Sequence, residues 1–94
     1  MGNRRRLLKG QLQEPVIEGT DVIGLIVLSD GGEEKTFYTD GMGLPISFDP
    51  KSRYAVSAIV SGYDGNLTAQ SLSLQELHNG QPHGRRMTYK RNGL

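Results

Sequence analysis

Turn-forming residues divide this chain into short segments, and their spacing limits the folds that it can adopt. Residues 39–43, 49–52 and 62–66 each combine Gly, Pro, Asp or Asn within a few positions. These residue types favour turns, because Gly adopts positive φ, Pro fixes φ, and Asp and Asn bond their own backbone. The stretches between them are too short for long packed helices. An all-β fold of short antiparallel strands is therefore predicted.

The segments between the turns alternate as strands with one buried face do. In residues 54–61, large and small apolar side chains occupy one face, and mostly small or polar ones occupy the other. Residues 22–28 are apolar on both faces, which is typical of a central strand. We expect strands at residues 7–13, 22–28, 35–39, 46–48, 54–61 and 67–74, with a core that includes Ile26, Phe48, Val56 and Ile59.

Two glycines are expected at corners of the fold. Gly43 and Gly62 occupy positions where a turn demands positive φ or a close backbone approach. Tyr63 follows Gly62 directly, and its ring is expected to pack across the end of the domain.

These strands can close in two ways. The first is a small antiparallel β-sandwich. The alternative is a five-stranded OB-like barrel, indicated by a strand at residues 54–60, a tight turn at Asp64-Gly65 and a strand from residue 67. OB proteins that bind single strands use exposed aromatic side chains as a platform. Phe37 and Tyr38 are adjacent and face opposite sides of their strand, so we rank the sandwich first.

Several turn motifs resemble those of one known group of β-sandwich modules. Thr39-Asp40 with Gly43, Tyr54-x-Val56 and Gly62-Tyr63 occur in an order and spacing similar to the carboxypeptidase-regulatory, transthyretin-like and collagen-adhesin B-type modules, which are Ig-like. The resemblance covers roughly residues 7–74. It departs at Pro45, where such modules place a strand residue. What it implies is a non-catalytic sandwich used for support, display or adhesion.

The length of 94 residues predicts one domain with a modest core. We divide the chain into a basic N-terminal arm at 1–6, a β-sandwich domain at 7–77 and a basic C-terminal arm at 78–94. The absence of cysteine excludes disulfides and thiol catalysis. The longest apolar run, residues 22–28, is too short to span a bilayer, and no signal peptide is visible, so we expect a soluble protein made in the cytoplasm.

The net charge of +1 hides a strong segregation of charge along the chain. Residues 1–10 carry four cations and no acid, and residues 81–94 again carry four cations and no acid. The middle holds all ten acids against three cations. Basic segments of this kind bind anionic partners. The candidate partner-binding residues are Arg4, Arg5, Arg6, Lys9, Arg85, Arg86, Lys90 and Arg91.

No arrangement of residues indicates catalysis. The chain has no nucleophile elbow, no phosphate-binding Gly-rich loop and no calcium-loop spacing of acids. His78 and His83 with Glu76 are weak candidates for a metal site, because histidines in a polar, Gly-containing segment are far more often solvated. We expect neither enzymatic activity nor a cofactor.

The function predicted first is that of a structural or interaction protein. In this reading the domain is an accessory subunit of a larger assembly such as a virion, a tail or a surface appendage. Its basic arms bind protein neighbours in a homo- or hetero-oligomer. The alternative is an OB-like nucleic-acid-binding protein. We rank it second because the acidic middle of the chain would repel a nucleic acid lying across it.

Overall fold

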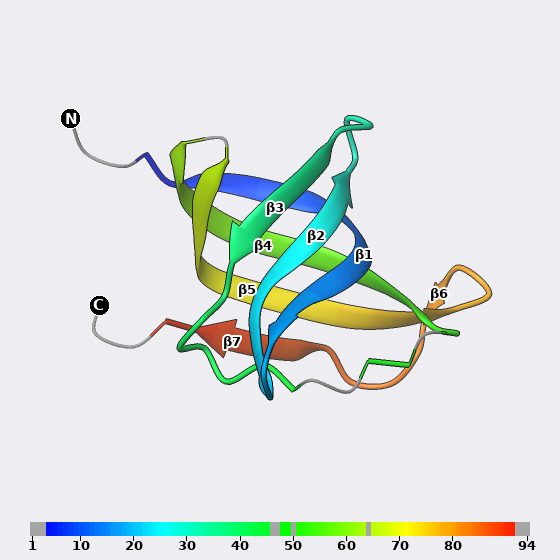
Figure 1. Ribbon diagram of the computed structural model, residues 1–94. Coiled ribbons are helices and arrows are strands. Elements are labelled where there is room, and N and C mark those ends of the chain that lie inside the picture. The colour runs from blue at the N-terminus through cyan, green and yellow to red at the C-terminus, as the bar shows by residue number, and fades with distance from the viewer. Residues whose placement is uncertain (1–3, 46–47, 50, 64, 92–94) are drawn as a thin grey trace.

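The computed structural model describes residues 4–45, 48–49, 51–63 and 65–91, which form seven strands and no helix (Figure 1). The strands are β1 (Arg6–Glu18), β2 (Asp21–Ser29), β3 (Glu34–Tyr38), β4 (Arg53–Tyr63), β5 (Asn66–His78), β6 (Gln81–Pro82) and β7 (Met87–Lys90). The predicted small, antiparallel all-β fold is confirmed. Within the described ranges, no helix has the length and apolar character needed to cross a membrane.

Strand pairing closes the first five strands into a ring. β1 pairs with both β2 and β4, β2 pairs with β3, and β4 pairs with β5, all antiparallel. A short parallel pairing of β3 with β5, Phe37 opposite Leu67 and Tyr38 opposite Thr68, completes the ring. In Figure 1, β2 and β3 cross steeply over β1, β4 and β5. The order β1–β2–β3–β5–β4–β1 corresponds to the five-stranded barrel alternative rather than to two separate sheets.

Closure of the ring depends on the bend of β1. Its first half pairs with β4 through Gln11, and its second half pairs with β2 from Gly10 onward. The register shifts between Leu12 and Glu14, so Gln13 is an extra residue of a β-bulge. Bulges bend a strand and increase its twist, which lets one strand serve two parts of a barrel. Gly10 lies at this corner, where a Cβ would collide with the carbonyl oxygen of Leu28.

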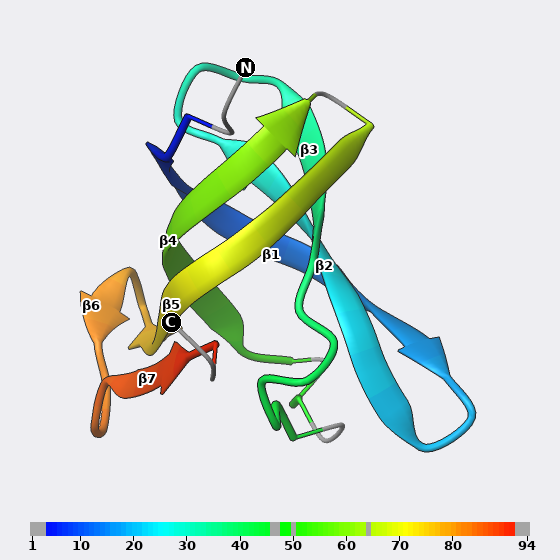
Figure 2. The same cartoon turned by 90° about the vertical axis from the view of Figure 1, so that its left-hand side faces the viewer.

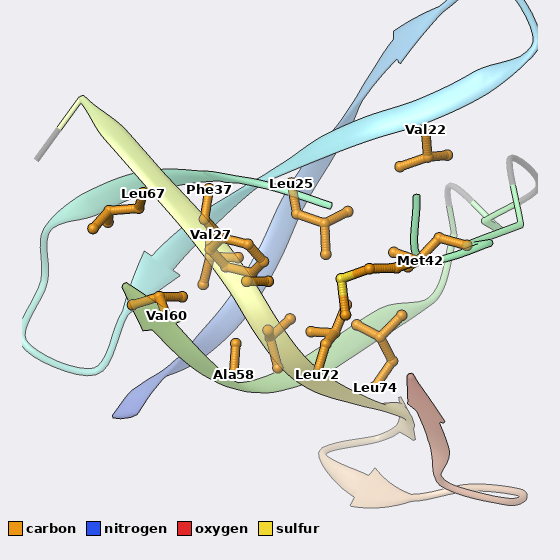
Figure 3. Packing of buried hydrophobic residues seen from close by; sticks show 13 residues of the cluster. Val22, Leu25, Val27, Phe37, Met42, Ala58, Val60, Leu67, Leu72 and Leu74 are labelled. Atoms are coloured by element: carbon orange, nitrogen blue, oxygen red, sulfur yellow. The ribbon is translucent and has the colours of Figure 1, made fainter. Parts of the chain in front are cut away.

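The core fills the inside of the ring (Figure 3). Its largest fully buried side chains include Phe37, Leu25, Leu74, Val27 and Val60. The prediction for Val56 is confirmed, since only 2% of this residue is exposed. The predictions for Ile26, Phe48 and Ile59 are wrong, because all three are only half-buried. Leu25 and Val27 turn inward on β2, which places Ile26 on the outside, and Ile59 faces outward between the inward Ala58 and Val60.

The turns agree with the sequence except at Tyr63. Gly43 and Gly62 have φ angles of 77° and 106°, which confirms their predicted conformations. At Gly62 a Cβ would also collide with the carbonyl oxygen of Asn66. Tyr63 is 69% exposed, so its predicted packing across the end of the domain is wrong. Ile46 of the predicted strand at 46–48 lies outside the described residues, and Phe48 meets Tyr54 edge-on with ring centroids 5.5 Å apart.

The two basic segments continue the sheet. Arg6 begins β1, and the segment 78–94 contains β6 and β7, which both pair with β5. Met87 lies opposite Leu74 and Tyr89 opposite Leu72, and both side chains pack against the core. Because the inward side of β7 is apolar, its alternate residues Thr88 and Lys90 are exposed.

Candidate functional site

The two basic segments lie at opposite edges of one four-stranded face. The first half of β1, then β4, β5 and β7, follow one another across this face, and Figure 1 shows them stacked in that order. Figure 2 shows β4 and β5 nearest the viewer, with β1 behind them. The N-terminal and C-terminal segments therefore lie on the same face, separated by β4 and β5.

Strand register places specific side chains in rows across this face. One row runs from Lys9 to Ser57, Ser73 and Thr88. The next row runs from Leu7 to Ile59, Ser71 and Lys90. Successive side chains of a strand alternate between faces, so these residues all face outward while Leu8, Ala58, Leu72 and Tyr89 turn toward the core.

Three adjoining hollows join these rows into one shallow groove. Its outward-facing lining residues are Arg5, Leu7, Lys9, Ala55, Ser57, Ile59, Ser71, Ser73, Gln75, Arg86, Thr88 and Lys90. We call this set the basic groove. One end pairs Arg5 with Lys90, and the other end pairs Lys9 with Arg86. Each end therefore combines a cation from the N-terminal segment with one from the C-terminal segment.

No acidic side chain lines the described part of the basic groove. The acids belong to other elements: Glu14, Glu18 and Asp21 to the β1–β2 hairpin, Asp30, Glu33 and Glu34 to the β2–β3 hairpin, Asp40 and Asp49 to the β3–β4 connection, and Glu76 to the end of β5. Asp64 lies outside the described residues. Among the described residues, Arg5, Lys9, Arg86 and Lys90 form no ion pair. The middle of the chain has a net negative charge, but its described acidic side chains therefore do not line the basic groove.

The segment that precedes β7 is held by hydrogen bonds to residues of β5. The Gln75 side-chain amide donates hydrogen bonds to the carbonyl oxygens of His83 and Gly84, at 3.1 and 3.3 Å. The His83 backbone N–H donates to the Glu76 carbonyl oxygen at 2.8 Å. These bonds hold the loop that leads to Arg86, which places this cation at the rim of the basic groove.

The remaining predicted binding residues have other surroundings. Arg4 and Arg85 are exposed and are not among the residues that line the basic groove. The Arg6 guanidinium donates to the Gly62 carbonyl oxygen at 3.3 Å. Arg91 borders one end of the basic groove, and its guanidinium donates to the Ala69 carbonyl oxygen at 2.8 Å.

Arg91 also joins β5 to the end of β3. Its Nη1 donates to the Asp40 carbonyl oxygen at 2.7 Å, next to the short β3–β5 pairing that closes the barrel. We expect Arg91→Ala to lower the free energy of unfolding by about 1–3 kcal/mol, because the carbonyl of the buried residue Ala69 loses a charged donor. Arg91→Lys should recover only part of this loss, since an ammonium group lacks the planar fork of donors.

Thermal unfolding followed by circular dichroism measures this effect. Arg86→Ala is the matched control, because it removes an exposed guanidinium from the same segment and should leave stability within about 0.5 kcal/mol. Equal melting temperatures for Arg91→Ala and Arg86→Ala would contradict a structural role for Arg91.

The sequence reasoning missed the floor of the basic groove. Ser71, Ser73 and Gln75 alternate with Leu72 and Leu74 along β5, and Ser57 lies opposite Ser73. This polar–apolar alternation was visible, but it identifies a solvent face without showing which cations border it. The pairing of β1 with β4 and of β7 with β5 supplies that information.

The candidate metal ligands do not form a cluster. The rings of His78 and His83 lie 5.4 Å apart between centroids, while the Glu76 carboxylate accepts a 2.6 Å hydrogen bond from the Ser52 hydroxyl. Within the described ranges, no group of three or more His, Cys, Asp or Glu side chains could hold a metal ion.

Fold and groove together define a small five-stranded β-barrel with two added C-terminal strands and a cationic outer face. No protein-family model matches the chain, and neither the curated proteins nor the solved structures contain a significant match to it. The geometry of the basic groove is therefore the feature that bears on function. The resemblance of the turn motifs to the transthyretin-like group stays a prediction.

Proposed function

We propose that this protein is a non-enzymatic binding module that holds single-stranded nucleic acid in the basic groove. The observation that carries this proposal is the convergence of cations from both ends of the chain on one face, whose described lining residues include no acid. Proteins that bind single strands without sequence preference use a positively charged groove that follows the backbone, and OB folds build this groove on a small barrel. The five-stranded ring supplies such a scaffold.

The chemistry of the basic groove supports a phosphate-rich ligand. Arg5, Lys9, Arg86 and Lys90 supply charge, while Ser57, Ser71, Ser73 and Thr88 supply hydroxyl groups between them. Arginine, lysine and hydroxyl side chains are the usual donors to phosphate and sugar oxygens. A flexible strand can bend along the shallow groove on the outer face of the barrel and reach both rims, whereas a rigid duplex contacts fewer cations at once.

Salt dependence tests this proposal. Fluorescence anisotropy with labelled dT oligonucleotides should show binding at low salt that weakens as salt rises. Four neutralised phosphates predict a log–log slope of about −2.8 on a single strand, which is a loss of about fifty-fold between 50 and 200 mM salt. Duplex DNA of equal length should bind more weakly. An absence of binding at 50 mM salt would overturn the proposal.

A cleft outside the basic groove favours a second function. In this proposal the protein is a subunit of an assembly such as a virion, a tail or a surface appendage. Leu12, Ile17, Phe48 and Tyr54 form the apolar walls of the cleft, and Glu14 and Asp49 add carboxylates. Ile17 is 48% exposed. Arginine pairs with carboxylates and stacks on aromatic rings, so the cleft suits a basic segment of a neighbouring copy.

The two proposals differ in the oligomeric state that they require of the protein in the absence of nucleic acid. The assembly proposal requires oligomers without nucleic acid, measured by size-exclusion chromatography with light scattering. Oligomers that dissociate when Glu14 and Asp49 are changed to Gln and Asn would favour assembly. A monomer at all accessible concentrations would count against assembly of identical copies.

A further inference from the structure

The basic groove lacks the aromatic platform that usually holds bases. Phe37 is fully buried in the core, and Tyr38 emerges on the outer face of β3. Phe48 and Tyr54 contact each other at the other cleft. Tyr89 borders the middle of the basic groove, but its ring packs against the core and its hydroxyl lies 3.7 Å from the sulfur of Met87. Among the described aromatic residues, only Tyr89 borders the groove floor, and its ring is partly buried against the core.

The floor instead consists of small and aliphatic side chains. Ala55, Ser57, Ser71 and Ser73 are half-buried, and Ile59 beside Leu7 forms an apolar centre. These side chains leave space close to the sheet and present hydroxyl groups there. They suit sugar and phosphate groups, since stacking of a base requires a flat ring.

The four cations form two pairs, one at each end of the basic groove, and each pair can contact two successive phosphates. Arg5 and Lys90 lie at one end, while Lys9 and Arg86 lie at the other. Four residues of extended chain from Arg5 to Lys9 span about 13 Å, and three inter-strand steps from β1 to β7 span about 14 Å. This area fits a short stretch of strand, about four nucleotides, at the lower end of the site sizes of OB folds.

We infer that the basic groove recognises the sugar-phosphate backbone of a single strand and not its bases, through one pair of cations at each end. This inference rests on the proposed function and specifies its ligand. Stacking on an aromatic ring contributes roughly five-fold or more in affinity per base. Without such a ring, removal of the bases should cost little.

An abasic oligonucleotide tests the inference. The affinity of the full chain for a labelled dT hexamer is compared with that for a hexamer of abasic tetrahydrofuran phosphates, by anisotropy at 50 mM salt. We expect dissociation constants within about three-fold of each other. A loss of ten-fold or more with the abasic hexamer would overturn backbone recognition while leaving nucleic-acid binding intact. Failure of both hexamers to bind would overturn the proposed function as well.

Tyr63 provides the second arm of this experiment. Its ring is exposed in β4 beside the β4–β5 turn and does not line the basic groove. We expect Tyr63→Ala to leave the affinity for both hexamers unchanged. A weaker complex of Tyr63→Ala with the dT hexamer alone would show that a base stacks on this ring, and would overturn the inference even if the first comparison agreed with it.

Discussion

Reversing one cation on each rim, in the double variant Lys9→Glu and Lys90→Glu, is expected to nearly abolish binding of single-stranded nucleic acid. Lys9 belongs to β1 and Lys90 to β7, and they border opposite ends of the basic groove. Loss of two of four phosphate contacts predicts an affinity lower by about sixty-fold or more at 50 mM salt, with the log–log slope falling to about −1.4. Anisotropy titrations at several salt concentrations measure both quantities.

Lys51→Glu is the matched control for the single reversal Lys90→Glu. Both residues are exposed and both substitutions change the net charge equally, but Lys51 lies in the turn after Asp49 and outside the basic groove. If binding reflected only net charge, the two variants would weaken it equally. Equal losses would therefore refute a localised site. Unchanged melting temperatures would show that the variants remain folded.

Phe37→Ala is expected to destabilise the domain more than any change on the outer faces. Phe37 is completely buried and lies beside Leu25 and Val27 in the core (Figure 3). Truncation of a buried Phe costs about 3–5 kcal/mol, against about 5–14 kcal/mol of total stability for a domain of this size. The melting temperature should fall by about 12 °C or more, as measured by circular dichroism.

Ile26→Ala is the comparison that checks which face of β2 is buried. Ile26 is a neighbour of Leu25 and Val27 but faces outward and is only half-buried. Its truncation should cost clearly less than that of Phe37, on the order of 1 kcal/mol for partial loss of buried area. If Ile26→Ala lowered the melting temperature as much as Phe37→Ala, the inward face of β2 would be the opposite one.

Local sequence features predicted where the strands and turns lie, but not always which side chains of a strand point into the core. The turn at residues 49–52 forms a backbone bond from Ser52 to Asp49, and the Ser29 hairpin closes with Glu33, as turn chemistry predicts. For residues 22–28 the pattern is apolar throughout. The two faces of this strand are therefore equally apolar, and the sequence pattern assigns Ile26 to the core as readily as Leu25. Only the pairing of β2 with β1 and β3 distinguishes them.

Closure of the barrel also depended on long-range pairing. A sequence specifies that strands exist, but the choice between two sheets and one ring is made by contacts between distant residues. Here the bulge at Gln13 bends β1 so that it pairs with both β2 and β4, and the pairing of Phe37 with Leu67 closes the ring. Neither contact is indicated by a pattern of neighbouring residues in the sequence.

By itself the sequence determined the all-β class, the positions of the turns and the identity of every cation in the basic groove. These properties depend on local backbone preferences and on residue type, which are readable along the chain. Tertiary structure alone decided that Lys9 and Arg86 border one groove, while Arg91 bonds the carbonyls of Ala69 and Asp40. The physical reason is that the interaction between two charges depends on their distance in space and not on their separation along the sequence. Residues separated by most of the chain become neighbours only when β4 and β5 pair between them.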